Sequence, residues 1–288
     1  MATGATEFID NTTADVFIPE IWSPLAIVAR EQQLVFAKLV DRRFEDGLTA
    51  GDTIHVPSVG DLAARQKAQN DNAAITYETV TETNLDITIA THMYAAIAVE
   101  SIVKVQGNRD QLAMYAGKLG YALGLDVDDT LAGLPDNFSQ TVGTLAAENT
   151  YHDYLRAIQY LDDANAPAEN RYFVISPAAE VGLMKADIYT NNDYSMLHGE
   201  GRNTALEFAY VSSFLNVPVY KTTNVEGTNS AGHDNTLFQK EALALVMQMS
   251  PTMHSMFDID YLVDKVAIEQ LYGTREMRDD HGVCIKGA

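Results

Sequence analysis

The side chains best suited to catalysis or metal binding in this 288-residue chain are its seven histidines and its single cysteine, Cys284. A His-Glu-x-x-His spacing would bind zinc, but no histidines here have that or another metal-binding spacing. Cys284 has no sequence context that suggests an activated thiolate. Because His55 and His92 fall in strand-like segments, we expect them to be packed or hydrogen-bonded. The other histidines are His152, His198, His233, His254 and His281.

Three aspartates, Asp126, Asp128 and Asp129, raise the question of a cation site. They are one to three residues apart near the end of a helical segment, which is not the ligand spacing of a calcium-binding loop. We therefore expect them to form a solvated helix face.

The glycines do not form a nucleotide-binding loop. Gly117, Gly120 and Gly124 lie within a helical pattern and lack the Gly-Lys-Ser/Thr order of a phosphate loop. Each costs a helix about 1 kcal/mol relative to alanine, so we expect them to allow bending or close packing. Residues 199–201 lack the third glycine of a dinucleotide loop, and no Gly-x-Ser-x-Gly elbow occurs. The sequence therefore predicts no catalytic, cofactor-binding or metal-binding residues, and no cofactor.

The composition is that of a folded and strongly acidic protein. Hydrophobic residues make up 47% of the chain, and its formal net charge is -21. An acidic surface repels nucleic acid, so we expect no tight grip on DNA, although the chain could sit near DNA without holding it. No apolar run reaches the roughly 18 residues of a membrane helix, and no secretion signal is recognisable. One cysteine excludes an intrachain disulfide and fits a reducing compartment.

The elements expected in the first third build an arm, a helix and a long hairpin. Residues 1–20 are small and polar and read as an arm, and a helix is predicted over 23–40 with Pro24 in its first turn. A strand over 53–56 and another over 75–90 are joined by a polar segment without core residues. A two-stranded arm is marginal in water, so we expect it to lie on another surface.

The rest of the chain alternates helices and strands and ends in two long apolar ribbons. Ribbons of this kind need a partner surface to bury their apolar faces. The expected elements are helices over 108–131 or 133, 151–161 and 177–184, strands over 171–176 and 217–223, loops over 189–204 and 227–235, and ribbons over 241–250 and 258–272.

Three groups of sequence segments follow one another along the chain. Together they cover nearly all of it from about residue 17. The first is a strand that leads through a polar tip to a second strand. The second is a helix that leads into a buried strand. The third is a strand followed by two segments of the C-terminal ribbons. No single segment is diagnostic, and the specificity lies in their order and spacing. The segments are Gly51-Asp-Thr-Ile-His-Val-Pro57 with Leu85-Asp-Ile-Thr-Ile-Ala90, Leu161-Asp-Asp-Ala-Asn-Ala-Pro167 with Arg171-Tyr-Phe-Val-Ile-Ser-Pro177, and 214–224 with 240–245 and 271–278.

In this order the chain resembles the major capsid protein of tailed bacteriophages, the Hong Kong 97-type fold. The resemblance implies an α+β fold with an N-terminal arm, an extended E-loop hairpin, a spine helix, a peripheral domain and an axial domain. It implies that 1–40 form the arm and first helix, 41–95 the E-loop hairpin, 96–139 with 246–288 the peripheral domain with the spine helix, and 140–245 the axial domain.

The resemblance also implies a structural role rather than an enzymatic one. Copies of the chain would assemble as hexamers and pentamers into an icosahedral shell around phage double-stranded DNA, without sequence-specific binding and without a membrane. The implied partners are the chain itself, a portal protein and separate scaffolding or decoration proteins. Loops over 186–205 and 226–235 would meet at the capsomer centre. The implied location is the virion, and the host cytoplasm during assembly.

Some members of the family crosslink an E-loop lysine to an asparagine of the peripheral domain. Lys67 could be that lysine, but no asparagine follows Asn235. We therefore expect a noncovalent shell. No long charged helical prodomain precedes residue 20, so we expect that scaffolding is either a separate protein or was cleaved from a precursor, and Met1 favours the former.

Two other interpretations remain open at this point. A bacterial encapsulin would share the fold and enclose cargo enzymes, although the longer arm and E-loop tip favour a phage protein. Alternatively, an acidic α+β enzyme could assemble a site from Asp, His and Tyr side chains that are far apart in sequence.

Overall fold

A computed structural model describes residues 34–45, 51–60, 62–67, 74–80, 82–100, 102, 111–145, 147–185, 213–228 and 230–287. The expected arm over 1–20, most of the helix predicted over 23–40 and the expected loop over 189–204 lie outside the described residues. Within the described part of that predicted helix, only α1 (Phe36–Leu39) is helical.

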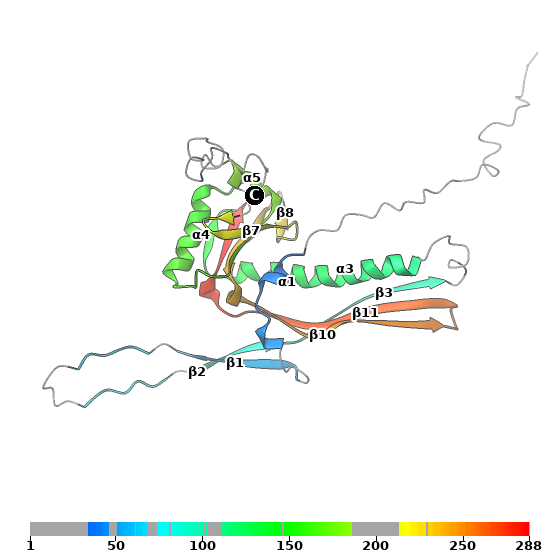
Figure 1. The fold of residues 1–288 in the computed structure, drawn as a ribbon, viewed down its shortest axis with the longest axis horizontal. Helices are drawn as coiled ribbons and strands as arrows, with labels where there is room; N and C mark the ends of the chain where they lie inside the picture. The colour runs from blue at the N-terminus through cyan, green and yellow to red at the C-terminus, as the bar shows by residue number, and fades with distance from the viewer. Residues whose placement is uncertain are drawn as a thin grey trace, which may run out of the picture. The chain divides into compact units, whose positions relative to one another are not determined.

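The two C-terminal ribbons pair with each other, as their apolar patterns predict. Strands β10 (Leu243–Asp258) and β11 (Val263–Glu276) are antiparallel, and β3 (Thr91–Glu100) adds to the other side of β11. β11 is therefore the central strand of a three-stranded sheet (Figure 1). The β10–β11 register shifts twice between Met247 and Thr252, around Pro251. Proline cannot donate a ladder hydrogen bond, so it is tolerated here because β10 is an edge strand.

Helix α3 (Gln111–Ala132) covers one face of this sheet, where it lies along β3 and β11 (Figure 1). Val99, Val266 and Ile268 are buried on this sheet. Gln270 donates a hydrogen bond from Nε2 to the carbonyl oxygen of Leu123 at 3.0 Å. Among the described residues, no helix is both long and apolar enough to span a membrane. The predicted long helix is confirmed over 111–132.

The glycines of α3 have different environments. A Cβ on Gly124 would lie 2.8 Å from the Cδ1 of Leu34, whereas Cβ atoms on Gly117 or Gly120 would meet nothing within 4 Å. Close packing, one of the two expected explanations, therefore applies to Gly124.

The predicted hairpin consists of β1 (Thr53–Val59) and β2 (Glu82–Thr88), paired from Thr53↔Thr88 to Val59↔Glu82. Its second strand is much shorter than the predicted 75–90, because 74–80 form no regular structure. The base of the hairpin packs on the ribbons through a small buried cluster of Ile87, Ile89, Ala244 and Val246.

A seven-stranded mixed sheet forms the other large part of the fold. Its strand order is β4–β12–β9–β5–β7–β6, and β8 pairs with β9. The strands are β4 (Thr141–Gly143), β5 (Arg171–Ile175), β6 (Ser213–Phe214), β7 (Val217–Lys221), β8 (Gly227–Thr228), β9 (Gly232–Gln239) and β12 (Gly282–Gly287).

Helices α4 (Tyr151–Asp163) and α5 (Pro177–Met184) pack with this sheet and contribute buried side chains to the same hydrophobic core. Thr150 and Asp153 form a capping box at the start of α4, and Ser176 caps α5 by accepting a hydrogen bond from the Ala179 amide. Both predicted helices are confirmed. The aromatic rings of Tyr154, Phe173 and Phe214 pack edge to face or tilted in the core.

Two expectations for the C-terminal third were wrong. The segment predicted as a loop over 227–235 instead contains β8 and the first half of β9, joined by a turn. Its polar Asn235 is tolerated in a strand because it is buried and hydrogen-bonded: it accepts from the Ser176 amide at 2.6 Å and donates to the carbonyl oxygen of Ile285 at 3.4 Å. The chain also continues beyond the ribbons into β12, which pairs with β9 and β4.

Candidate contact surfaces and titratable clusters

The connected ends of β10 and β11 carry a group of exposed apolar side chains, which we call the ribbon tip. Beyond Thr252 the residues of β10 are exposed almost without interruption, so the alternation of one buried and one exposed face is lost. α3 covers β3 and β11 but barely reaches β10, which explains why both faces of this edge strand remain open. The ribbon tip comprises Met253, Met256, Phe257, Ile259, Tyr261 and Leu262.

The loop beyond β1 and β2 is a second exposed apolar surface. Tyr77 is 83% exposed and Leu62 64% exposed, and Ile75 is also open to solvent. Glu78 ties the two sides of the loop together, because it accepts hydrogen bonds from Arg65 and from the amide of Ala63, both at 3.0 Å. Apolar side chains this far from any described core need another surface to bury them.

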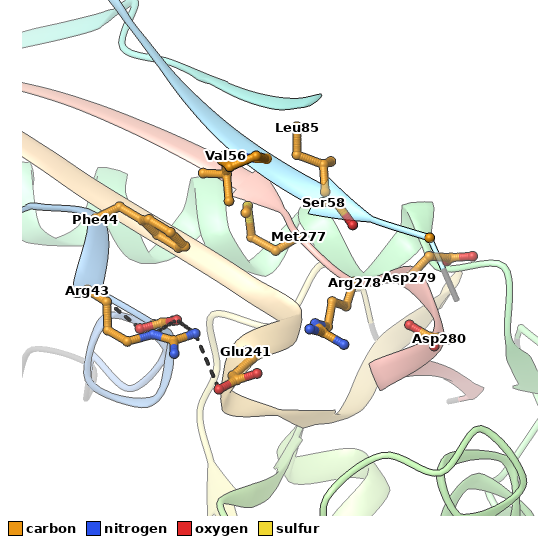
Figure 2. Close-up of a pocket in the computed structure, with 13 residues that line it drawn as sticks. Arg43, Phe44, Val56, Ser58, Leu85, Glu241, Met277, Arg278, Asp279 and Asp280 are labelled. Carbon is orange, nitrogen blue, oxygen red and sulfur yellow. Dashed lines mark hydrogen bonds and ion pairs between the residues drawn. The ribbon is translucent and has the colours of Figure 1, made fainter. Parts of the chain in front are cut away.

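An open groove of about 560 Å³ lies at the base of the hairpin. Figure 2 shows Phe44, Val56 and Met277 along it, with charged side chains at its lower end. Arg43 pairs with Asp41 at 2.7 Å and with Glu241 at 3.3 Å. These contacts pair three of the charged side chains that line the groove, and no nucleophile with an adjacent base lines it among the described residues.

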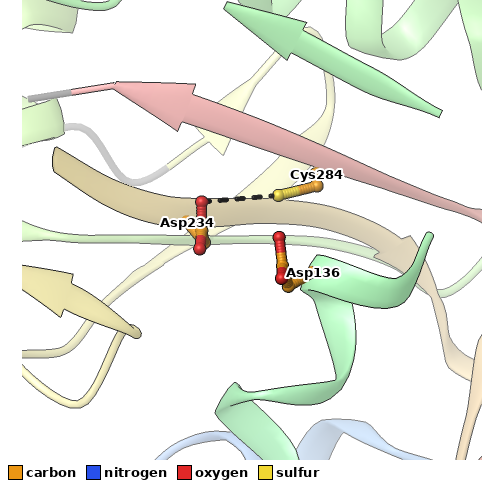
Figure 3. Close-up of side chains that lie close together, drawn as sticks. All are labelled: Asp136, Asp234 and Cys284. Atoms are coloured by element: carbon orange, nitrogen blue, oxygen red, sulfur yellow. Dashed lines mark hydrogen bonds between the residues drawn. The ribbon is translucent and has the colours of Figure 1, made fainter. Parts of the chain in front are cut away.

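One group in the described part of the chain has its carboxylate and thiol atoms within 4.8 Å of one another: Asp136, Asp234 and Cys284 (Figure 3). The ammonium of Lys286 lies 2.6 Å from Asp136 and 4.0 Å from Asp234, so the chain itself supplies a cation there. Burial raises the pKa of the Cys284 thiol to about 12, and burial also raises the pKa of Asp234. The raised pKa favours the protonated thiol over the thiolate that a nucleophile requires.

The expected solvated face of Asp126, Asp128 and Asp129 is wrong for Asp128. Its side chain is fully buried and accepts hydrogen bonds from the amides of Val35 and Ala37 and from Asn224. Asp128 therefore holds the residues that begin α1, a role that depends on contacts distant in sequence. Asp129 is exposed, as expected, whereas Asp126 is half-buried and accepts a hydrogen bond from the Tyr272 hydroxyl at 2.7 Å.

The histidines do not gather into one site in the described part of the chain. His55 hydrogen-bonds to Asp86 at 2.5 Å, and His92 to Glu269 at 2.9 Å, as expected for hydrogen-bonded strand residues. His254 bonds to the other oxygen of Glu269 at 2.9 Å. This shared carboxylate was not anticipated, because it depends on the register of three strands. His198 lies outside the described residues, and His281 is buried with its pKa lowered by burial.

Comparisons with known proteins give a structural likeness without a sequence match. No protein-family model matches the sequence, and no curated protein does. A structure from Mycobacterium phage Che8 matches 93% of this chain and 97% of its own, with a TM-score of 0.79 and 22% identity. The capsid structure of cyanophage P-SCSP1u matches 96% and 94%, with a TM-score of 0.75 and 17% identity.

The mature capsid of bacteriophage PhiM1 is also similar, with a TM-score of 0.72 and 14% identity over 94% of this chain and 92% of its own. The likeness spans both chains almost completely in each case. The chain therefore has the fold of phage capsid proteins, and the fold class expected from the sequence is confirmed.

Proposed function

We propose that this chain is the major capsid protein of a tailed bacteriophage, and that it self-assembles as hexamers and pentamers into an icosahedral shell around double-stranded DNA. The observation that carries the proposal is the end-to-end structural match to phage capsids, which leaves no additional domain for another activity within the matched region. The exposed hairpin loop and ribbon tip support it, because both present apolar side chains that a single described subunit leaves uncovered.

The parts of the fold are assigned to capsid elements on the same basis. Residues 1–40 would form the arm and first helix, and 41–95 the E-loop hairpin. Residues 96–139 with 246–288 would form the peripheral domain, and 140–245 the axial domain. β12 (282–287) departs from this assignment, because it falls within 246–288 but pairs with β4 and β9 of the axial sheet.

The partners follow from the proposed role. Copies of the chain would contact each other, a portal protein and separate scaffolding or decoration proteins, in the host cytoplasm during assembly and then in the virion. The net charge of -21 suits a container that encloses DNA without gripping it, because an acidic wall repels phosphates. A structural rather than enzymatic role is part of the proposal.

Electron microscopy of the expressed chain tests the proposal. We expect closed shells, tubes or capsomers, with phage DNA inside particles isolated from infected cells. A strictly monomeric protein under all conditions of salt and concentration would defeat it. An enclosed enzyme in place of DNA would instead indicate an encapsulin-type compartment.

A further inference from the structure

Glu269, on the central strand of the three-stranded sheet, contacts a histidine from each neighbouring strand. Its Oε2 lies 2.9 Å from Nε2 of His92 on β3, and its Oε1 lies 2.9 Å from Nε2 of His254 on β10. The register places both histidines diagonally from it: Glu269 is opposite Tyr94 and Thr252, and each histidine is two residues further along its strand. All three side chains therefore point to the same face of the sheet.

This His–Glu–His cluster lies where the pairing of β10 resumes. The register shifts end at Thr252, whose partner is Glu269, and regular pairing then continues to Asp258. On the opposite face, the next residue, Gln270, is bonded to α3. The central strand is thus fixed to α3 on one face and to both neighbouring strands on the other. The outer half of β10, which carries part of the ribbon tip, has the fewest other attachments because it is an edge strand.

The geometry points to a proton-sensitive clamp: we propose that protonation of His92 and His254 around the Glu269 carboxylate tightens the attachment of β10 and β3 to β11 at mildly acidic pH. A hydrogen bond between an imidazolium and a carboxylate is stronger than one from a neutral imidazole, and both imidazoles already contact the carboxylate. The clamp is a property of the single chain and does not depend on the proposed function.

The carboxylate stays ionised across the relevant pH range. The hydrogen bond from His92, with a second from His254, lowers the pKa of Glu269 below its ordinary value. Histidines ordinarily titrate near pH 6.5. Protonation of both imidazoles would change the formal charge of the cluster from -1 to +1 while its central anion remains. On further acidification, the clamp would be lost when Glu269 itself is protonated, which happens below the ordinary pKa of a glutamate.

Other charged groups near the cluster leave this behaviour intact. On the same face, Lys265 is paired with Asp258 further along the ribbon. Glu100 is exposed at the end of β3, Tyr94 is exposed next to His92 on that strand, and Arg275 donates to the carbonyl oxygen of Asp86 on β2. α3 covers the opposite face and so does not face the cluster.

Hydrogen exchange of the full chain tests the clamp at pH 7.4 and 5.8, corrected for intrinsic exchange rates. Light scattering should first show the same oligomeric state at both values, so that a change in assembly is not mistaken for the clamp. Relative to β9, we expect amides of 252–258 to become roughly two- to fivefold more protected at pH 5.8. Glu269→Gln should abolish this change, whereas Glu100→Gln, a matched exposed carboxylate on the same face, should preserve it.

The two histidines separate the clamp from a general effect of acid. His254→Gln should remove the pH response of β10 and leave that of β3, and His92→Gln should do the reverse. Equal protection of the wild-type ribbon at both pH values would overturn the proposal. So would a pH response that survives in Glu269→Gln.

Discussion

The carboxylate of Asp128 accepts a hydrogen bond from the amide of Val35 at 3.1 Å, across 93 positions of sequence. A second amide, that of Ala37, and the Nδ2 of Asn224 bind the same side chain at 3.3 and 3.2 Å. One buried aspartate thus joins three separate segments: the start of α1, the C-terminal end of α3 and the segment that follows β7. Nothing in the local sequence distinguishes it from Asp129, which is exposed one residue later.

Replacing Asp128 should destabilise the subunit strongly. Asp128→Ala leaves two backbone donors and an amide without their acceptor in a buried place, and we expect a loss of about 2–4 kcal/mol in the free energy of unfolding. Asp129→Ala is the matched control and should change it by less than about 0.5 kcal/mol. Urea denaturation of unassembled subunits measures both. Similar losses for the two variants would contradict the role given to Asp128.

Gly273 on β11 should tolerate no side chain. A Cβ there would lie 2.4 Å from the carbonyl oxygen of Thr88, so the backbone at the base of the hairpin would have to move. We expect Gly273→Ala to destabilise the chain by about 1–3 kcal/mol. Gly120→Ala provides the contrast, because a Cβ there meets nothing within 4 Å and alanine favours a helix by about 1 kcal/mol. Thermal denaturation should move in opposite directions for the two variants.

The buried thiol of Cys284 should make stability fall at alkaline pH. Burial raises its pKa from an ordinary 9.0 to about 12. Between these values the unfolded chain has released the thiol proton and the folded chain keeps it, so the free energy of unfolding decreases as pH rises, by at most about 1.4 kcal/mol per pH unit.

Comparing wild type with Cys284→Ala between pH 8 and 11 isolates this contribution, since other titrating groups are common to both. The wild type should lose more stability over that range. Rapid alkylation of the folded wild type at pH 8 would show that the thiol is neither buried nor protonated.

The ribbon tip should be required for assembly and not for folding. Ile259 is 78% exposed, so Ile259→Asp should leave the circular dichroism spectrum and melting temperature unchanged. A charge at an apolar contact costs desolvation, so shells should be absent or much reduced by electron microscopy and sedimentation. Asp260→Asn, at the neighbouring position of the same turn, should assemble normally. Normal shells from Ile259→Asp would remove the ribbon tip from the proposed interface.

The shell should be held together without covalent links between subunits. Lys67 is exposed, but the sequence has no asparagine after Asn235 that could be its partner in the C-terminal segment. Denaturing gels of mature particles should therefore show single subunits, for wild type and for Lys67→Arg alike. A ladder of linked subunits that disappears in Lys67→Arg would disprove this.

The sequence determined the local elements whose signals lie within a few residues. Ser176 and Pro177 begin α5, the apolar spacing from Tyr151 to Leu161 produces α4, and the two C-terminal apolar runs become paired strands. The order of these elements was enough to anticipate the fold class. Predictions from local sequence patterns were wrong where contacts between residues distant in sequence determine the structure. Much of the polar segment over 227–235 became strand, and its buried Asn235 is satisfied by the amide of Ser176 and the carbonyl oxygen of Ile285.

Only the tertiary structure decided which polar residues act together. Asp128 is buried because α1 folds onto α3, although its local sequence resembles a solvated face. Glu269 meets His92 and His254 because two strand registers, one of them shifted by bulges, bring positions 177 and 15 residues apart onto one face. Helix and strand periodicity are set by neighbouring residues, whereas register and burial are set by the packing of the whole chain.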